Sequence, residues 1–283
     1  LSVRNSHLAA GAGIVLTDDS VLTQRFWKIF KRHRCTSFAG VPYSYTMLDR
    51  IGFEAFDIPA LRTMTQAGGK MDNGLILKFH SLMRRRAGRF FVMYGQTEAT
   101  ARMSYLPPDR LPAKVGSVGI AIEGGALSLA GGRRAANGCR VAEVVYRGKN
   151  VMLGYAETRA DLALGDLTGG TLRTGDIGYR DKDGFLFLTG RLKRISKIYG
   201  LRVNLDEIEN RLKARGPAAV VGTDEKIIAY CEYGDASLYN RLRKELALAY
   251  KLHHDSFEFR KTAALPRKPS GKIDYAQLAA GPS

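Results

Sequence analysis

The sequence predicts an α/β region, then a β-rich region, then a smaller α+β unit. Helical apolar spacing alternates with short apolar runs over residues 1–110. Over residues 111–190 the helical period disappears, and short alternating segments are separated by glycine-rich turns. Helical and strand-like segments return over residues 191–283. We therefore expect three parts with these boundaries, the second being a small antiparallel sheet or β-barrel-like subdomain.

The elements of the first region follow from spacing and turn residues. Asp18-Asp19-Ser20 is predicted to cap a helix, and a second helix follows later; their apolar positions are Leu22, Phe26, Ile29 and Phe30, then Leu75, Phe79, Leu82 and Met83. Residues 37–41 and 89–94 are predicted to be buried strands. Ligands commonly bind in the loops at the carboxyl ends of such strands.

The remaining elements are shorter. Strands are predicted over residues 142–146 and 185–188 in the middle region. In the last region Asn204, with Glu207 three residues later, resembles a capping box that begins a helix ending at Arg215. The segments that follow are predicted to be strand, strand, helix and strand, over residues 218–222, 226–233, 237–252 and 257–259.

Composition excludes several classes of protein. The chain has 283 residues, 45% of them hydrophobic, which excludes disorder throughout. Apolar runs end within about ten residues, short of the ~20 that a bilayer requires, so we expect no membrane span. No basic segment leads into an apolar stretch, so no secretory signal is expected. The separated cysteines Cys35, Cys139 and Cys231 favour a reducing, cytoplasmic location without disulfides or structural zinc.

The chain is strongly basic, with a formal net charge of +17. The excess is spread over both ends, and only Arg84-Arg85-Arg86 with Arg89 forms a dense run. This run ends a helical pattern, where cations interact favourably with the helix dipole. A nucleoside triphosphate would also be attracted by such a field. Because no RNP-like, zinc or helix-turn-helix motif occurs, we expect no nucleic-acid partner.

Four loops carry the candidate chemistry. They are YGQTE at 94–98, RTGD at 173–176, GRLK at 190–193 leading to KIYG at 197–200, and PRKPSGK at 266–272. The P-loop, the Rossmann glycine motif, HExxH and GxSxG are all absent from the sequence. Taken singly, each of the four loops is also typical of a solvated turn.

In this order and spacing, the loops resemble the adenylate-forming superfamily of acyl-CoA synthetases, luciferases and peptide synthetase adenylation domains. The resemblance covers essentially the whole chain, with further matches at residues 38–42, 67–69, 118–119 and 148–155. It implies part of a large adenylation domain, made of an α/β subdomain and a β-rich subdomain, followed by a small mobile α+β lid domain. It also implies ATP or AMP and Mg²⁺ as cofactors.

The resemblance assigns roles to residues of the first loop and its neighbours. Tyr94 would stack on adenine, although an aromatic at a strand end can also simply pack in the core. Thr97 would bind a phosphate, and Glu98 would hold Mg²⁺, which prefers carboxylate oxygen; the alternative for both is a surface turn. Gly95, Gly68 and Gly69 lie in matching loops and are assigned to nucleotide binding. Residues 41–45 and 67–70 are candidates for the acid pocket, where Tyr43 and Tyr45 fit packing equally well.

The later loops would complete the site. Asp176 would accept hydrogen bonds from the ribose hydroxyls, and Arg191 would reach the ribose or a phosphate. Lys272 would bridge the substrate carboxylate and the α-phosphate. Lys193 stands where the family commonly has a hinge aspartate, a variant that some members share. Rotation about Lys193 would present first Lys272, then Lys197 and Gly200, to the pantetheine tunnel.

The function implied is ATP-dependent activation of a small carboxylic acid as an acyl-adenylate, followed by transfer to CoA or to the phosphopantetheine of an acyl carrier protein. In this family a Ser/Thr/Gly-rich phosphate loop precedes the segment that corresponds to residue 1, so the chain resembles the second half of such an enzyme. We therefore expect the chain alone to be weak or inactive. The alternatives are a non-catalytic or split-gene remnant that binds nucleotide or a partner protein, and a basic nucleic-acid-binding protein.

Overall fold

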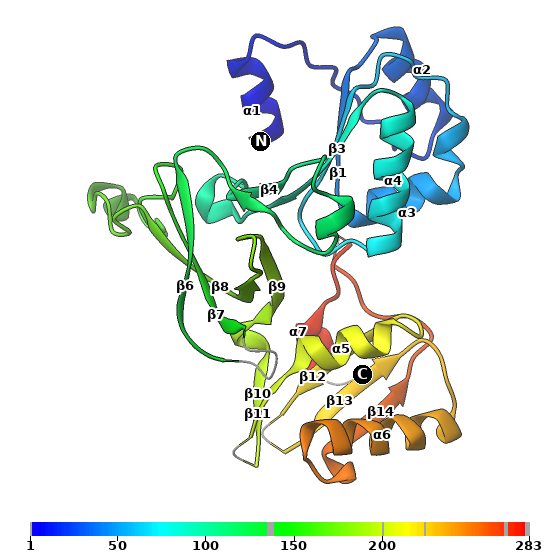
Figure 1. Cartoon of the computed structure of the whole chain (residues 1–283), viewed down its shortest axis with the longest axis vertical. Helices are drawn as coiled ribbons and strands as arrows, with labels where there is room; N and C mark the ends of the chain where they lie inside the picture. Colours follow the sequence, from blue (N-terminus) through cyan, green and yellow to red (C-terminus); the bar gives the residue numbers. More distant parts are fainter. Residues whose placement is uncertain (1, 135–138, 200, 224, 269–270, 281–283) are drawn as a thin grey trace. The chain divides into compact units, whose positions relative to one another are not determined.

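The computed structural model describes residues 2–134, 139–199, 201–223, 225–268 and 271–280 (Figure 1). The chain divides into two compact units. The first unit consists of Leu1–Thr174 and Gly178–Leu188, and the second consists of Gly175–Ile177 and Thr189–Ser283. Each unit has its own hydrophobic core.

A five-stranded mixed sheet organises the first unit. Its strands, in spatial order, are β1 (Ser37–Gly40), β2 (Thr63–Gln66), β3 (Arg89–Tyr94), β4 (Ser104–Leu106) and β5 (Ile120–Ala121). The pairs β1–β2 and β2–β3 are parallel, whereas β3–β4 and β4–β5 are antiparallel. The strands predicted at residues 37–41 and 89–94 are confirmed as β1 and β3.

Helices α1 (Ser2–Ala9), α2 (Gln24–Arg32), α3 (Pro42–Arg50) and α4 (Asn73–Arg85) belong to the same unit. The predicted second helix is confirmed as α4, and the Asp72 side chain caps it by accepting from the Leu75 N–H. The predicted cap of α2 at Asp18-Asp19-Ser20 is wrong. Thr23 caps this helix instead, because its hydroxyl accepts from the Phe26 N–H at 3.3 Å and the turn from Ser20 precedes it.

Aromatic side chains fill the core of the first unit. Trp27 and Phe30 of α2, Tyr45 of α3 and Phe79 of α4 are each at most 7% exposed. The Tyr45 ring meets the Phe79 and Phe90 rings edge-on, with centroids 4.9 and 5.3 Å apart, a favourable geometry for aromatic pairs. Burial of each such side chain contributes about 1.5–3 kcal/mol to folding, so the helices hold the strands of this sheet firmly in place.

A second sheet has four strands, in the order β6 (Gly125–Arg134), β7 (Arg140–Gly148), β8 (Thr171–Arg180) and β9 (Leu186–Arg191). The strands predicted at residues 142–146 and 185–188 lie in β7 and β9. Over the described residues the strand order ends at β6 and β9, so the expected barrel-like subdomain is an open sheet and not a closed barrel. Four strands are too few to close around a core, since small barrels take about eight.

The second unit is α+β, as predicted. The hairpin β10 (Ile195–Ile198) and β11 (Leu201–Asn204) leads into α5 (Leu205–Lys213), and a three-stranded sheet has the order β12 (Ala218–Gly222), β13 (Ile227–Cys231) and β14 (Phe257–Lys261). Helices α6 (Ala236–Tyr250) and α7 (Tyr275–Ala280) follow β13 and β14. Asn204 caps α5, but its side chain accepts from the Asp206 N–H and not from that of Glu207. The helix ends at Lys213, two residues before the predicted end.

Strand β12 is buried on both faces. Ala218 and Val220 belong to the apolar cluster that includes side chains of α5 and α6, whereas Ala219 and Val221 belong to a second cluster with Leu278 of α7. Successive side chains of a strand point to opposite faces, which explains the continuous apolar run that predicted this strand. Helix α7 is therefore fixed against the face opposite to α5.

The three regions expected at 1–110, 111–190 and 191–283 stay a prediction. The fold class is confirmed, but the two compact units share strands β8 and β9, and the last crossing between the units comes after Leu188.

Among the described residues, no helix is long and apolar enough to span a bilayer.

His80 of α4 is a buried histidine that should make the first unit sensitive to acid. It is 5% exposed, and neither ring nitrogen has a hydrogen-bond partner. Burial, with a smaller effect from the charge of Arg84, lowers the pKa of His80. The fold therefore holds the neutral ring. Its contribution is complete above the ordinary histidine pKa of about 6.5 and is lost as the pH falls below that value.

We predict that stability falls below pH 6.5, with His80 contributing a slope of at most about 1.4 kcal/mol per pH unit. His80→Leu should remove this part of the slope, whereas His33→Leu, at an exposed histidine, should leave it in place. Urea unfolding between pH 5 and 7.5 measures both. Equal slopes in the His80→Leu variant and the unmodified protein would contradict the prediction.

Candidate functional site

Three loops lie at one edge of the first sheet. They follow β1, β2 and β3, whose parallel pairing brings their carboxyl ends together. The Ala67 N–H donates to the Gly40 carbonyl at 3.2 Å. A Cβ at Gly68 would lie 3.4 Å from Val41 Cγ1, and one at Gly69 would lie 3.3 Å from Pro42 Cγ. The two segments predicted to form the acid pocket, residues 41–45 and 67–70, are therefore in contact.

The tyrosines of the first segment differ. Tyr45 is fully buried and its hydroxyl donates to the Thr65 carbonyl at 2.7 Å, so it packs in the core. Tyr43 is 57% exposed and remains a candidate for contact with a substrate.

The loop at residues 94–98 begins inside an apolar cluster. Tyr94, at the end of β3, is 8% exposed and packs with Ala99 and Met103. Most of its side chain is therefore packed in the core, which was the alternative to stacking on adenine. Its predicted contact with adenine stays a prediction. Thr97 is exposed at the start of a short 3-10 turn, Thr97–Ala99.

Gly95 allows the chain to close tightly on itself. A Cβ there would lie 2.5 Å from both the carbonyl carbon and the carbonyl oxygen of Ala101. Backbone groups cannot move aside as a flexible side chain can. The geometry of the 94–98 loop therefore requires glycine at this position.

Glu98 is held from a distant part of the same unit. Its Oε1 accepts from the Tyr155 hydroxyl at 2.6 Å, and its carbonyl accepts from the Met152 N–H at 2.8 Å. The hydrogen bond to Glu98, more than burial, raises the pKa of Tyr155. No role was predicted for Tyr155, although it ends the matching segment 148–155. That membership is the signal that could have identified it.

A magnesium ion at Glu98, as predicted, would be shared with a nucleotide. Over the described residues, the group of three metal-ligating side chains is His253, His254 and Asp255, which are exposed and belong to the second unit. Among the described residues, Glu98 belongs to no such group. Mg²⁺ is commonly bound by one or two carboxylates together with substrate phosphates and water, so a single carboxylate suits an ion that arrives with ATP.

Asp176 and Arg191, the two predicted ribose residues, are in direct contact. Asp176 of β8 is 3% exposed, and its Oδ1 lies 2.8 Å from Arg191 Nε at the end of β9. The Arg191 N–H donates to Asp206 Oδ2 at 3.0 Å, which fixes the backbone as well. Asp206 was missed by the sequence reasoning, because the residue also fits the first turn of a helix, where acidic side chains are common.

The segment predicted to act as a hinge contains an exposed lysine, Lys193, followed by an arginine in ion pairs, Arg194. Lys193 is exposed within the 3-10 turn Leu192–Arg194. Arg194 is only 14% exposed in its side chain and pairs with Asp206 and Glu209 at 2.8 and 2.7 Å. The hinge role of Lys193 stays a prediction. The Lys197 side chain and Gly200 lie outside the described residues.

Lys272 lies near the carboxyl end of the second unit. Its carbonyl accepts from the Lys268 N–H at 2.8 Å, and Arg267 forms an isolated bridge with Ile273. The Lys272 side chain is exposed, as a lysine that reaches toward a ligand must be. Its catalytic role stays a prediction.

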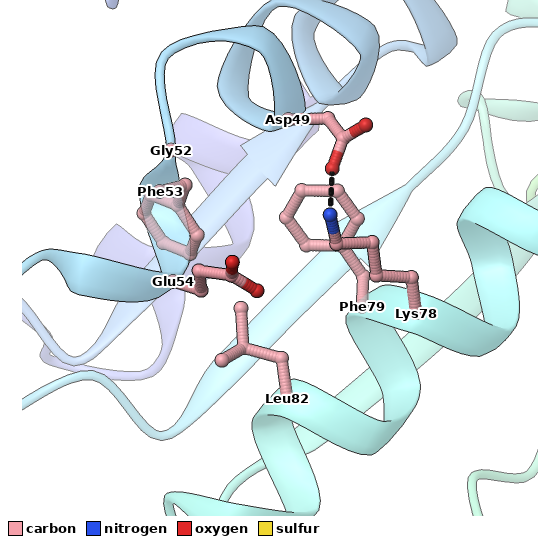
Figure 2. Close-up of a pocket in the computed structure, with 7 residues that line it drawn as sticks. All are labelled: Asp49, Gly52, Phe53, Glu54, Lys78, Phe79 and Leu82. Atoms are coloured by element: carbon pink, nitrogen blue, oxygen red, sulfur yellow. Dashed lines mark ion pairs between the residues drawn. The ribbon is translucent and has the colours of Figure 1, made fainter.

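Neither of the two best-defined cavities is lined by a predicted site residue. The first holds only about 10 Å³, lies against Phe53, Phe79 and Leu82, and contains the Lys78–Asp49 ion pair at 2.6 Å (Figure 2). That volume suffices for about one water molecule. The second is an open groove of about 600 Å³ beside Arg147, Lys149 and several glycines.

Comparison with known families explains this arrangement of loops. Residues 3–156, more than half of the chain, match the family model described as AMP-binding enzyme. The chain belongs to the AMP-binding enzyme family. The resemblance to adenylate-forming enzymes that the sequence motifs indicated is thereby confirmed.

The curated relatives are acid–CoA ligases. A sulfoacetate–CoA ligase of Cupriavidus necator is 32% identical over 272 residues, covering 89% of this chain and 51% of the relative. A 2-succinylbenzoate–CoA ligase of Bacillus pumilus is 29% identical over 267 residues, covering 88% and 51%. The chain thus spans about half the length of the curated relatives that it matches.

Solved structures confirm the fold of this AMP-binding enzyme family member. The o-succinylbenzoate CoA synthetase of Bacillus subtilis, in complex with its acyl-adenylate intermediate, superposes with a TM-score of 0.76 at 22% identity, covering 98% of this chain and 57% of the other. The amide bond synthetase McbA of Marinactinospora thermotolerans superposes with a TM-score of 0.74 at 25% identity, covering 98% and 59%.

We predict that Gly95→Ala destabilises the first unit by about 1–3 kcal/mol, because the added methyl group meets the Ala101 backbone. Gly13→Ala is the matched control, since a Cβ at Gly13 would meet nothing within 4 Å. Chemical denaturation followed by circular dichroism measures both variants. A loss of stability no larger than that of Gly13→Ala would show that the loop tolerates a side chain.

Proposed function

We propose that this protein takes part in the ATP-dependent activation of a carboxylic acid and its transfer to a thiol. The observation that carries the proposal is the contact of Asp176 with Arg191 at 2.8 Å, since the family resemblance assigns both residues to the same part of a nucleotide. A buried carboxylate beside an arginine offers a ribose its acceptor and a phosphate its donor in one place.

The reaction has two steps. An oxygen of the substrate carboxylate attacks the α-phosphorus of ATP, pyrophosphate leaves, and an acyl-adenylate forms. A thiolate then attacks the acyl carbon, and AMP leaves with the bonding electrons of the anhydride. Magnesium would neutralise phosphate charge in the first step, with Glu98 as its protein ligand.

The residues of this chain would bind and orient the reactants. Asp176 would accept from the ribose hydroxyls, and Arg191 would donate to ribose or phosphate. The ammonium group of Lys272 would stabilise the negative charge that develops between carboxylate and α-phosphate. Thr97 would donate its hydroxyl to a phosphate oxygen, and Tyr94 would contact adenine with the exposed part of its ring.

We favour CoA as the thiol, because the matching curated relatives are named CoA ligases; the phosphopantetheine of an acyl carrier protein is the alternative acceptor. The acid is a small carboxylate. The relatives act on acids as different as sulfoacetate, 2-succinylbenzoate, indoleacetate and oxalate, so membership of the family does not select one. A non-catalytic protein that binds nucleotide or a partner is the alternative function.

The first test is nucleotide binding by the chain itself. We predict that AMP binds with a dissociation constant of roughly 0.1–1 mM, and that Asp176→Asn weakens binding about tenfold or more by removing a charged acceptor. Asp109→Asn, at an exposed carboxylate, is the control. Isothermal calorimetry measures the three proteins. If the folded chain does not bind AMP, the nucleotide-binding roles of Asp176 and Arg191 are refuted, and a non-catalytic protein that binds a partner is favoured.

The second test separates the two steps. The protein is expressed with any in-frame segment encoded before Leu1. Lys272→Ala should lower carboxylate-dependent ATP–pyrophosphate exchange by about 10²–10³-fold, while thioester formation from preformed acyl-adenylate is retained. Lys268→Ala, at an exposed lysine whose backbone N–H donates to the Lys272 carbonyl, should affect neither step. Equal losses in both steps would refute the role assigned to Lys272.

A further inference from the structure

Glu209 of α5 is a buried carboxylate with hydrogen-bond donors on both oxygens. The residue is 4% exposed. Its Oε2 accepts from Arg194 Nη2 at 2.7 Å and from the Val220 N–H at 3.0 Å. Its Oε1 accepts from the Tyr275 hydroxyl at 2.7 Å and from the Lys213 ammonium. These donors compensate the cost of burying the charge.

Arg194 contacts the ring of Tyr275, whose hydroxyl donates to Glu209. The guanidinium carbon lies 4.0 Å from the centre of the Tyr275 ring, which is a cation–π contact. Burial alone would lower the pKa of Arg194, but the hydrogen bond with Asp206 and the charge of Glu209 raise it, so the guanidinium is cationic. Tyr275 is therefore fixed twice, through its hydroxyl and through its ring.

Both partners of this contact neighbour residues with proposed roles. Tyr275 follows Lys272 by three positions, and three residues of extended chain span at most about 11 Å. Between them, the Asp274 N–H donates to the Pro266 carbonyl at 2.9 Å. On the other side, Arg194 directly follows Lys193. Glu209 thus joins the segment of the catalytic lysine to the segment of the predicted hinge.

We propose that Tyr275 is a positioning residue that ties the backbone at Lys272 to α5 and to the Arg194 segment through Glu209. The effect of Tyr275 on acid activation rests on the proposed function. The attachment of the Lys272 backbone through Tyr275 does not. A lysine on a fixed backbone loses less conformational freedom when it reaches a phosphate, so the transition state is formed at a smaller entropic cost.

Helix α7 has a second attachment, through Leu278, that the Tyr275→Phe substitution leaves in place. Leu278 of α7 packs with Val221 and Leu265, and the Tyr230 hydroxyl donates to the Leu278 carbonyl at 3.1 Å. These contacts do not involve the Tyr275 hydroxyl. Tyr275→Phe should therefore loosen the backbone near Lys272 while α7 stays bound to β12.

The experiment compares two tyrosine hydroxyls of the second unit. Tyr275→Phe removes the hydrogen bond to Glu209, and Tyr233→Phe removes a hydrogen bond to the Leu212 carbonyl, also 2.7 Å long. Amide hydrogen exchange of residues 273–278 and the rate of trypsin cleavage after Lys272 are measured on the chain as it exists. We expect both rates to rise about tenfold or more in Tyr275→Phe, since its hydrogen bond is to a charged group. In Tyr233→Phe we expect a change of less than twofold.

Unchanged rates of amide exchange and trypsin cleavage in a folded Tyr275→Phe variant would overturn the proposal that Tyr275 anchors the backbone at Lys272. Equal acceleration in both variants would also overturn it, because a general loosening of the unit would then be sufficient. Slow exchange of the α5 and β12 amides confirms that each variant remains folded.

Activity measurements connect the anchor to catalysis. In the form of the protein used for pyrophosphate exchange, Tyr275→Phe should lower kcat for adenylate formation about tenfold, with an unchanged KM for ATP and unchanged thioester formation. If Lys272→Ala has no effect on exchange while Tyr275→Phe still accelerates proteolysis, the proposed function fails and the anchor stands. If proteolysis is unchanged, the anchor fails whatever the activity.

Discussion

The parallel pairing of β1, β2 and β3 determines where the first unit can bind a ligand. Parallel strands end at the same edge, so the loops after Gly40, Gln66 and Tyr94 meet there. The aromatic core beneath them keeps this edge in place. The contact of Glu98 with Tyr155 and the close approach of Gly95 to Ala101 then shape the last of the three loops.

In the second unit, ion pairs have the corresponding role. The ion pairs are Asp176 with Arg191, and Arg194 with both Asp206 and Glu209. The Arg191 backbone N–H donates to Asp206 and links the two groups. In a chain with a net charge of +17, such pairing keeps arginine side chains next to acceptors and away from one another. It also fixes each of the proposed functional segments of this unit to α5, which carries both Asp206 and Glu209.

The parts of the fold that the sequence predicted are those with a local signal. Strands β1, β3 and β12 are short apolar runs, and α4 has regular spacing with a cap. Helix α3 was missed, because Pro42–Arg50 has only two buried side chains, Tyr45 and Leu48, and no side-chain cap. The cap of α2 was placed too early, since Asp, Ser and Thr all occur before Gln24. The middle region was predicted as a small sheet or a barrel-like subdomain, because glycine-rich turns and alternation do not reveal whether edge strands pair.

The order of the motifs named candidate site residues but not the contacts that hold them. Motif order identified Glu98, Asp176 and Arg191, yet Tyr155 reaches Glu98 across 57 positions and Tyr275 reaches Glu209 across 66. Contacts between distant segments leave no periodic pattern in the sequence. The folded structure is needed to show which residues contact those that the motifs identify.

We propose that the 94–98 loop binds adenine. Photolabelling the chain with 2-azido-AMP, followed by mass spectrometry of the peptides, would locate the bound adenine. We expect a label on the peptide that contains residues 94–98, and we expect excess AMP, but not excess inorganic phosphate, to suppress it. A label confined to other peptides, or one that AMP does not suppress, would contradict the proposal.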